Sequence, residues 1–228
     1  MFAPWVLYKS DFQAIGGHDK LFAPFPYEDS DIFQRWILAG YELIQSRDSF
    51  VYHLTCRGHR WNETVGKDDA YYKEVSQKAA RNYIRKWGSW IKNDEYQYPI
   101  IAPKYNIAFV VKNCNIHVLE ALEPWCDKIY VDDLYDYIEK EQKNTLYDMS
   151  KRVLPLINST PFEDNDIVVE IDAKVFNNQS FNIIQQLPNI IKESGDIGRF
   201  ELGEDLTVTI NKIEELQDTL IKFKPIDK

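Results

Sequence analysis

The sequence predicts an α/β protein built in two parts, and three observations carry this prediction. Short apolar strands alternate with amphipathic helices through the second half of the chain, a sparser set of such elements occupies the first part, and a polar, proline-bounded segment at 92–103 separates them. The 228 residues, 44% of them hydrophobic, are enough for one large or two small cores. We therefore expect one domain over 1–95 and a smaller α/β domain over 104–228.

In the first part, residues 5–15 are apolar and aromatic and end at Gly16-Gly17, a pattern that predicts a strand entering a turn. Residues 29–38 carry apolar side chains at helical spacing, with acidic residues at the start, and predict a helix. A second strand is expected within 41–54, strongest at 50–54, followed by a long helix over 68–90.

The second part opens with a strand over 107–111, a helix over 116–125 and a strand over 128–131. Two strands joined by a helix of this length predict a βαβ unit in a parallel sheet. The later expected elements are helices over 135–141, 146–157, 181–193 and 213–223 and strands over 167–171, 199–202 and 206–210.

Composition excludes several classes of protein. No run of about 18 apolar residues and no signal-peptide pattern occur, so we expect a soluble, cytoplasmic chain without a transmembrane segment. Three cysteines without a CxxC pair argue against a disulfide framework or a thiolate zinc site. A net charge of -9 argues against nucleic acid as a partner, because such binders neutralise phosphates with clustered Lys and Arg.

Four short motifs follow one another before residue 61. They are the pair Gly16-Gly17, the short loop at 18–20 containing Asp19, the segment 28–31 (Glu-Asp-Ser-Asp) that opens the first long helix, and His53 on the second expected strand. The ordered set resembles the acceptor-side half of an inverting, metal-dependent family 2 glycosyltransferase of the GT-A fold, the nucleotide-diphospho-sugar transferase fold. The resemblance covers residues 1 to about 61, so it implies an incomplete GT-A-like first part.

The resemblance implies a separate role for the residues of the Gly-Gly turn and for those at the start of the first long helix. Asp29 would be the catalytic base that takes the proton of an acceptor hydroxyl as the sugar is transferred. Gly16, Gly17, Glu28 and Asp31 would bind the acceptor. The alternative is structural, because carboxylates in the first turn of a helix also cap it and offset its dipole.

The resemblance also implies a site for the donor. His53 would join the ligands of Mn²⁺ or Mg²⁺, and Arg57 and Arg60 would neutralise the leaving diphosphate. A structural histidine and solvated surface arginines are the alternatives.

The Asp-x-Asp motif of the family does not occur at the position that the resemblance requires. The Asp-x-Asp motif that holds metal and diphosphate belongs to a donor-binding half ahead of residue 1, so we expect this chain to be inactive alone. Asp172-Ala173-Lys174 follows an apolar strand in a similar way, but an ammonium replaces the second carboxylate and would repel a metal ion.

Two functions therefore stay open. The first is transfer of a sugar from a nucleotide-sugar to a glycan or other hydroxyl acceptor, completed by the N-terminal half. The second is a non-catalytic carbohydrate-binding or assembly module derived from a glycosyltransferase, in which aromatic side chains stack on sugars or a homodimer covers the exposed surface. The aromatic content of 14% motivates the second.

Overall fold

The fold is described from a computed structural model, which covers residues 5–46, 48–50, 52, 70–132, 135–157 and 159–221. The chain forms two compact units. Unit 1 contains Met1–Tyr83, Ile91–Ile101 and Thr219–Lys228, and unit 2 contains Ile84–Trp90 and Ala102–Asp218. No helix in the described part of the chain is both long and apolar enough to cross a membrane.

Unit 1 begins with a helix where we predicted a strand. Residues 9–14 form α1 (Lys9–Ala14), and the residues just before it have no regular structure. The main-chain N–H groups of Phe12 and Ile15 bond to carbonyls four residues back, and Ile15 is fully buried. The strand prediction was wrong because an apolar run of this length also suits a short helix, which pairs its main-chain groups within itself and needs no neighbouring strand.

The predicted helix over 29–38 is confirmed as α2 (Glu28–Leu38), with a 3-10 turn, η1 (Lys20–Phe22), before it. Its apolar face packs Ile32, Phe33 and Trp36 against Ile15. Three acidic residues occupy its first turn, where the partial positive charge of the helix dipole favours them.

The predicted strand over 41–54 is absent from the described residues of this segment, which are 41–46, 48–50 and 52. Residues 51, 53 and 54 lie outside the described part of the chain. A strand requires a neighbouring strand for its main-chain bonds, and the described residues of the segment join no ladder. The predicted long helix is confirmed as α3 (Ala70–Trp87).

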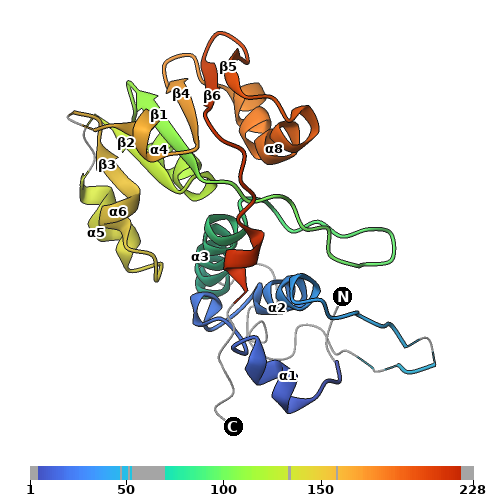
Figure 1. The fold of residues 1–228 in the computed structure, drawn as a ribbon. Helices are drawn as coiled ribbons and strands as arrows, with labels where there is room; N and C mark the ends of the chain where they lie inside the picture. The colour runs from blue at the N-terminus through green and yellow to red at the C-terminus, as the bar shows by residue number, and fades with distance from the viewer. Residues whose placement is uncertain are drawn as a thin grey trace. The chain divides into compact units, whose positions relative to one another are not determined.

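Unit 2 is α/β, as predicted, and holds a mixed six-stranded sheet in the order β3-β2-β1-β4-β6-β5 (Figure 1). The strands are β1 (Ile107–Lys112), β2 (Lys128–Val131), β3 (Val153–Pro155), β4 (Ile167–Asp172), β5 (Gly198–Glu201) and β6 (Leu206–Ile210). The first four are parallel, and β6 runs antiparallel to both β4 and β5.

The predicted βαβ unit is confirmed, because β1 and β2 are parallel and α4 (Ile116–Leu122) with η2 (Glu123–Trp125) joins them. The other helices are α5 (Tyr135–Gln142), α6 (Met149–Arg152), α7 (Pro161–Asp164) and α8 (Asn178–Ser194). The prediction of a helix over 146–157 was wrong in its second half, where Val153–Pro155 form the strand β3. The helix predicted over 213–223 is reduced to η3 (Gln217–Leu220), with residues 222 and 223 outside the described range.

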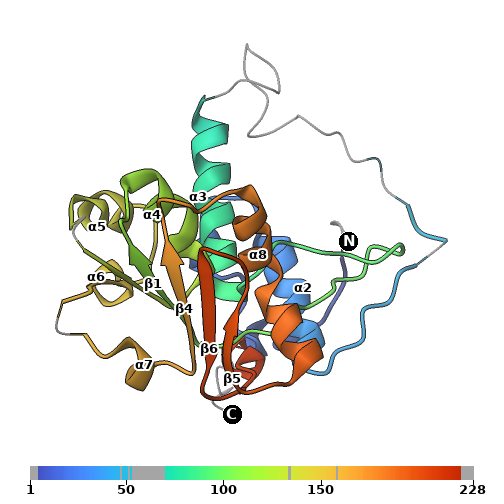
Figure 2. The ribbon, with the colours of Figure 1, turned by 90° about the horizontal axis from the view of Figure 1, so that it is seen from above.

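One face of the sheet packs against helices. Phe109, Ile129 and Val169 alternate inward along their strands and meet Leu119 of α4 and Leu187 of α8 in one core. Figure 2 shows α4 beside β1 and β4, and α8 beside β5 and β6. We call this side the helix face of the sheet.

Candidate functional site

The candidate site in unit 1 starts from the Gly16-Gly17 turn that follows α1. Both glycines have positive φ, 84° at Gly16 and 66° at Gly17. A Cβ at Gly17 would come within 3.0 Å of Cε1 of Phe12, whose main-chain carbonyl accepts the Gly17 N–H at 2.9 Å. Position 17 therefore requires glycine both for its backbone conformation and for the close approach of Phe12.

Arg35 of α2 holds this turn. Its Nη1 donates to the Ile15 carbonyl at 2.7 Å and its Nη2 to the Gly17 carbonyl at 2.6 Å. Its Nε donates to Oδ2 of Asp31, one helical turn earlier, at 2.8 Å. Arg35 and Asp31 are 1% and 0% exposed, so an ion pair shielded from water ties the turn to the first half of α2. We call Arg35, Asp31 and the two carbonyls the Arg35 clamp.

The three predicted carboxylates at the start of α2 have different surroundings. Asp31 is buried in the clamp, whereas Glu28 and Asp29 are half-buried. Oε2 of Glu28 is shielded from solvent without a hydrogen-bond partner among the described residues. The side chain of Asp29 makes no hydrogen bond or ion pair with the residues that the structure describes.

Aromatic side chains surround the start of α2. The Tyr27 ring lies 5.6 Å from that of Tyr83, and Phe25 stacks on Tyr72 at 5.7 Å. Burial and the neighbouring Tyr72 raise the pKa of Tyr27, so its phenol stays protonated at neutral pH and keeps its hydrogen for donation. Tyr71, whose ring centre is 6.5 Å from that of Phe25, is 57% exposed.

Among these aromatic side chains, Tyr83 connects α3 to α2. The amide Nε2 of Gln34 donates to the hydroxyl of Tyr83, and both side chains are buried. Burial and then the charge of Asp31 raise the pKa of Tyr83 far above its usual range. Tyr83 is thus a neutral, fixed neighbour of the clamp.

The structure therefore gathers some of the predicted site residues. Gly17 and Asp31 share Arg35 as a partner, while Glu28 and Asp29 occupy the first turn of the helix that carries it. His53, Arg57 and Arg60 lie outside the described residues. Arg35 was missed by the sequence reasoning, although its position four residues after Asp31 on a helix is the spacing of an ion pair.

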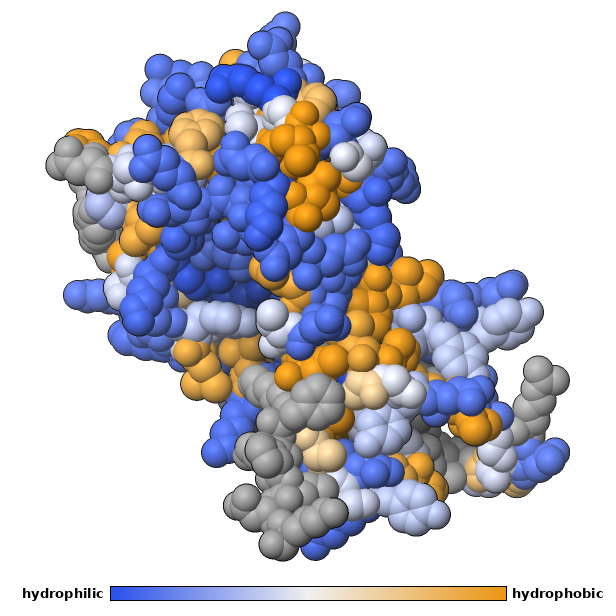
Figure 3. Space-filling view, viewed as in Figure 1, coloured by the Kyte–Doolittle hydropathy of each residue, from blue (hydrophilic) through white to orange (hydrophobic). Residues whose placement is uncertain are grey.

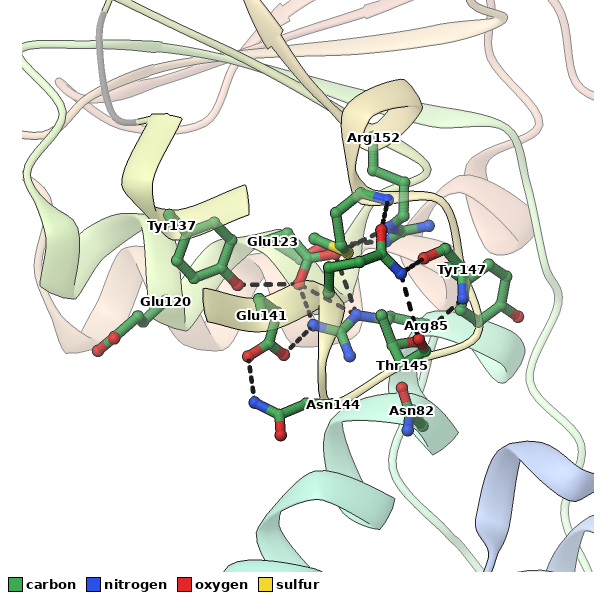
Figure 4. Close-up of polar contacts among 12 residues, drawn as sticks. Asn82, Arg85, Glu120, Glu123, Tyr137, Glu141, Asn144, Thr145, Tyr147 and Arg152 are labelled. Carbon is green, nitrogen blue, oxygen red and sulfur yellow. Dashed lines mark hydrogen bonds and ion pairs between the residues drawn. The ribbon is translucent and has the colours of Figure 1, made fainter. Parts of the chain in front are cut away.

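Unit 2 contains a second cluster of charged residues, formed around Glu123 at the end of α4 (Figure 4). Arg152 donates from Nε to Oε1 of Glu123 at 2.8 Å, and Arg85 donates from Nε to the same carboxylate at 3.1 Å. Arg85 also pairs with Glu141, and the hydroxyl of Tyr137 donates to Oε2 of Glu123 at 3.1 Å.

This cluster is buried and internally balanced. Burial opposes the charge of Glu123, but Arg152 and then Arg85 outweigh it and lower its pKa to about 2. Two cations and two anions therefore neutralise one another, and each of the four side chains is less than a tenth exposed. The cluster stabilises unit 2 around the last turns of α3, and its burial leaves no carboxylate open to a ligand.

The carboxyl end of β4 carries Asp172, the carboxylate of the Asp172-Ala173-Lys174 segment. Oδ1 of Asp172 accepts hydrogen bonds from Nδ2 of Asn113 and from the main-chain N–H of Lys174, each at 3.0 Å. These contacts lower the pKa of Asp172. Within the described ranges no three His, Cys, Asp or Glu side chains are gathered as metal ligands.

Cys114 lies near this end of the sheet, and its pKa is raised to about 11 by burial and by Asp132. Its thiol is therefore protonated at neutral pH, and it lacks the thiolate that nucleophilic catalysis requires.

No family model, no curated protein and no solved structure matches this chain.

Proposed function

We propose that this chain carries the acceptor side of a glycosyltransferase site, for transfer of a sugar from a nucleotide-sugar to a hydroxyl group of a glycan or similar acceptor. Asp29 is the catalytic base in this proposal. Its half-buried carboxylate has no partner among the described residues, so it is free to take a proton from an acceptor hydroxyl. Glu28, beside it, and Gly16-Gly17 contact the acceptor.

The Arg35 clamp is the observation that supports this proposal most. The sequence resemblance rests on separate motifs, at Gly16-Gly17 and at the start of α2, and a shared acceptor site requires them to be held in one fixed arrangement. Arg35 bonds to the carbonyls of Ile15 and Gly17 and, through Nε, to Asp31. Asp31 then acts as a positioning residue through Arg35 rather than by touching the acceptor.

The donor side of the proposal rests on the resemblance alone. His53 would contribute to a Mn²⁺ or Mg²⁺ site, and Arg57 and Arg60 would bind the diphosphate. A divalent ion there would stabilise the charge that develops on the leaving diphosphate. In this reading unit 1 supplies the acceptor side of a GT-A-like site.

The test combines acceptor binding with turnover. A glycan array should identify an acceptor, and its addition to ¹⁵N-labelled chain should shift the amide signals of Gly17 and of residues 28–31. We expect the chain alone to be inactive, so binding is the primary measurement and Asp29→Asn should retain it. In any condition that gives metal-dependent UDP- or GDP-sugar turnover, Asp29→Asn should lose about 100-fold or more of that turnover, the share that a general base supplies. Glu139→Gln on α5 is the matched control. The absence of both acceptor binding and sugar turnover, in every condition tested, would refute the proposal.

The alternative, a non-catalytic carbohydrate-binding module, is favoured by one observation. Tyr71 is 57% exposed and Trp90 is 43% exposed, as stacking on sugar rings requires, whereas Trp36 and Trp87 are buried. Trp61 lies outside the described residues. Glycan binding that is lost in Tyr71→Ala or Trp90→Ala but unchanged in Asp29→Asn, without turnover, would favour the module over the transferase.

A further inference from the structure

The sheet of unit 2 ends in β5, and no described strand lies on the outer side of β5. β5 is last in the strand order and pairs only with β6 within the described residues. An unpaired strand edge presents a row of main-chain N–H and C=O groups to any other strand that approaches it.

The register of the β5–β6 hairpin identifies the groups on this edge. The N–H of Leu202 donates to the carbonyl of Leu206 at 2.9 Å, so Leu202 faces β6. Main-chain groups alternate along an antiparallel pair, so Phe200 also faces β6, opposite Val208. The N–H and C=O groups of Arg199 and Glu201 therefore point outward.

The side chains on this edge are complementary to themselves. If β5 pairs antiparallel with a second β5 about a two-fold axis at Phe200, Arg199 of each strand lies opposite Glu201 of the other. Residues with outward main-chain groups then face each other, which is the arrangement that exchanges both hydrogen bonds. Glu201 has no ion-pair partner among the described residues, and Arg199 is 60% exposed while it contacts Glu170 at 2.8 Å.

Two exposed apolar side chains lie on elements next to β5. Ile197, immediately before β5, is 65% exposed, and Ile190 on α8 is 38% exposed. Figure 3 shows apolar side chains at the surface over α8, beside the β5–β6 hairpin and among hydrophilic ones. Phe200 and Leu202 lie on the helix face and are half-buried, so a second copy would cover them further.

We propose that unit 2 associates with a second copy of this chain through antiparallel pairing of β5 with β5, which joins the two sheets. The two Arg199–Glu201 pairs set the register, and the residues flanking the edge supply the apolar contact. The interface is isologous, as a two-fold axis requires, and it is independent of the proposed transferase site in unit 1. The strand is short, so we expect dissociation in the micromolar range.

The test is a charge exchange followed by sedimentation equilibrium on the full chain. The wild-type chain should form a dimer. Glu201→Arg should weaken it by about tenfold or more, because two like-charged pairs then face each other. The double variant Arg199→Glu with Glu201→Arg restores opposite charges across the axis and should recover most of the association. Glu139→Arg, the same charge change on α5, should leave the dimer unchanged.

A second measurement checks the register directly. Phe200→Cys places the same residue of both strands opposite itself, at a non-hydrogen-bonded position where side chains are close, so it should form an intermolecular disulfide under oxidation. Ser194→Cys, at the exposed end of α8 and outside β5, is the matched control and should not. A monomeric wild-type chain up to the highest attainable concentration, or a dimer that is indifferent to the charge exchange, would overturn the proposal.

Discussion

The guanidinium of Arg35 donates to the main-chain carbonyl of Gly17 at 2.6 Å, so a residue in the third turn of α2 fixes a turn that lies 18 positions earlier in the chain. The same guanidinium is neutralised by Asp31. A carboxylate that the sequence suggested as an acceptor ligand is thus linked to the turn suggested as its neighbour. The consequences of this link can be measured.

Removing the cation of the clamp should destabilise unit 1. Arg35→Met removes the cation that pairs with the buried carboxylate of Asp31 and should cost about 3–5 kcal/mol of unfolding free energy, measured by urea denaturation. The double variant Asp31→Asn with Arg35→Met should lose less than Arg35→Met alone, because position 31 then carries no charge that needs Arg35. Lys9→Met, an exposed cation in α1, is the control.

Gly17 and Gly40 provide a matched pair of glycines with positive φ. Gly17→Ala should be more destabilising than Gly40→Ala by about 1 kcal/mol or more, because a Cβ at 17 meets Cε1 and Cζ of Phe12 at 3.0 and 3.2 Å while a Cβ at 40 meets nothing within 4 Å. Both alanine variants are also strained by the left-handed backbone conformation. Equal losses in thermal unfolding would contradict the crowding at Gly17.

Asp29 and Asp31 should differ in stability as well as in function. Asp29→Asn should change the unfolding free energy by less than about 1 kcal/mol, because a half-exposed carboxylate contributes only its interaction with the helix dipole. Asp31→Asn should cost several times more, because Arg35 loses its buried counter-charge. A large loss at Asp29 would indicate that this residue is structural.

Glu123 should make the stability of unit 2 depend on pH in the acid range. Its pKa is about 2 in the folded chain against a usual 4.5, so its contribution is complete above about pH 4.5 and is lost as the pH falls towards 2. Glu123→Gln should cost about 3–5 kcal/mol at neutral pH and should flatten the decline of stability between these values.

The control for this acid dependence is Glu120→Gln. Glu120 belongs to an exposed pair with Lys140, so the change should cost less than about 1 kcal/mol. Unfolding followed by circular dichroism from pH 7 to pH 2 would test both variants. An unchanged acid profile in Glu123→Gln would refute the role of this residue.

The end of α3 should be required for unit 2. A fragment of residues 104–228, the predicted second domain, lacks Arg85 and leaves Glu123 and Glu141 without one of their cations. It should be less stable than a fragment of residues 84–228 by about 3–5 kcal/mol. Equal thermal midpoints for the two fragments would show that the last turns of α3 are dispensable.

Sequence patterns predicted best where periodicity and length agree. The apolar run at 107–111, the helical spacing after it and the strand at 128–131 specify a βαβ unit without reference to the rest of the chain. The prediction was wrong where a short apolar run suits either element, as in α1 and β3. In β3 the decisive factor is the edge of β2, which pairs Val153 with Ile129.

The candidate site divides in the same way. Local motifs suggested Gly16-Gly17 and the acidic start of α2 as candidates, and these remain predictions, but the motifs gave no reason to distinguish Asp31 from its neighbours. Burial makes that distinction, since it places Asp31 against Arg35 and leaves Asp29 without a partner among the described residues.

What the sequence by itself determined is therefore the α/β class, the periodic helices and strands, and the short motifs, because these depend on residues close together along the chain. Only the tertiary structure decided which carboxylate is buried with Arg35, that Glu123 gathers two arginines from distant elements, and that β5 ends the sheet with self-complementary charges. Such relationships arise from contacts between residues far apart in sequence, and the energy of a charge depends on the water and the partners that the folded chain leaves around it.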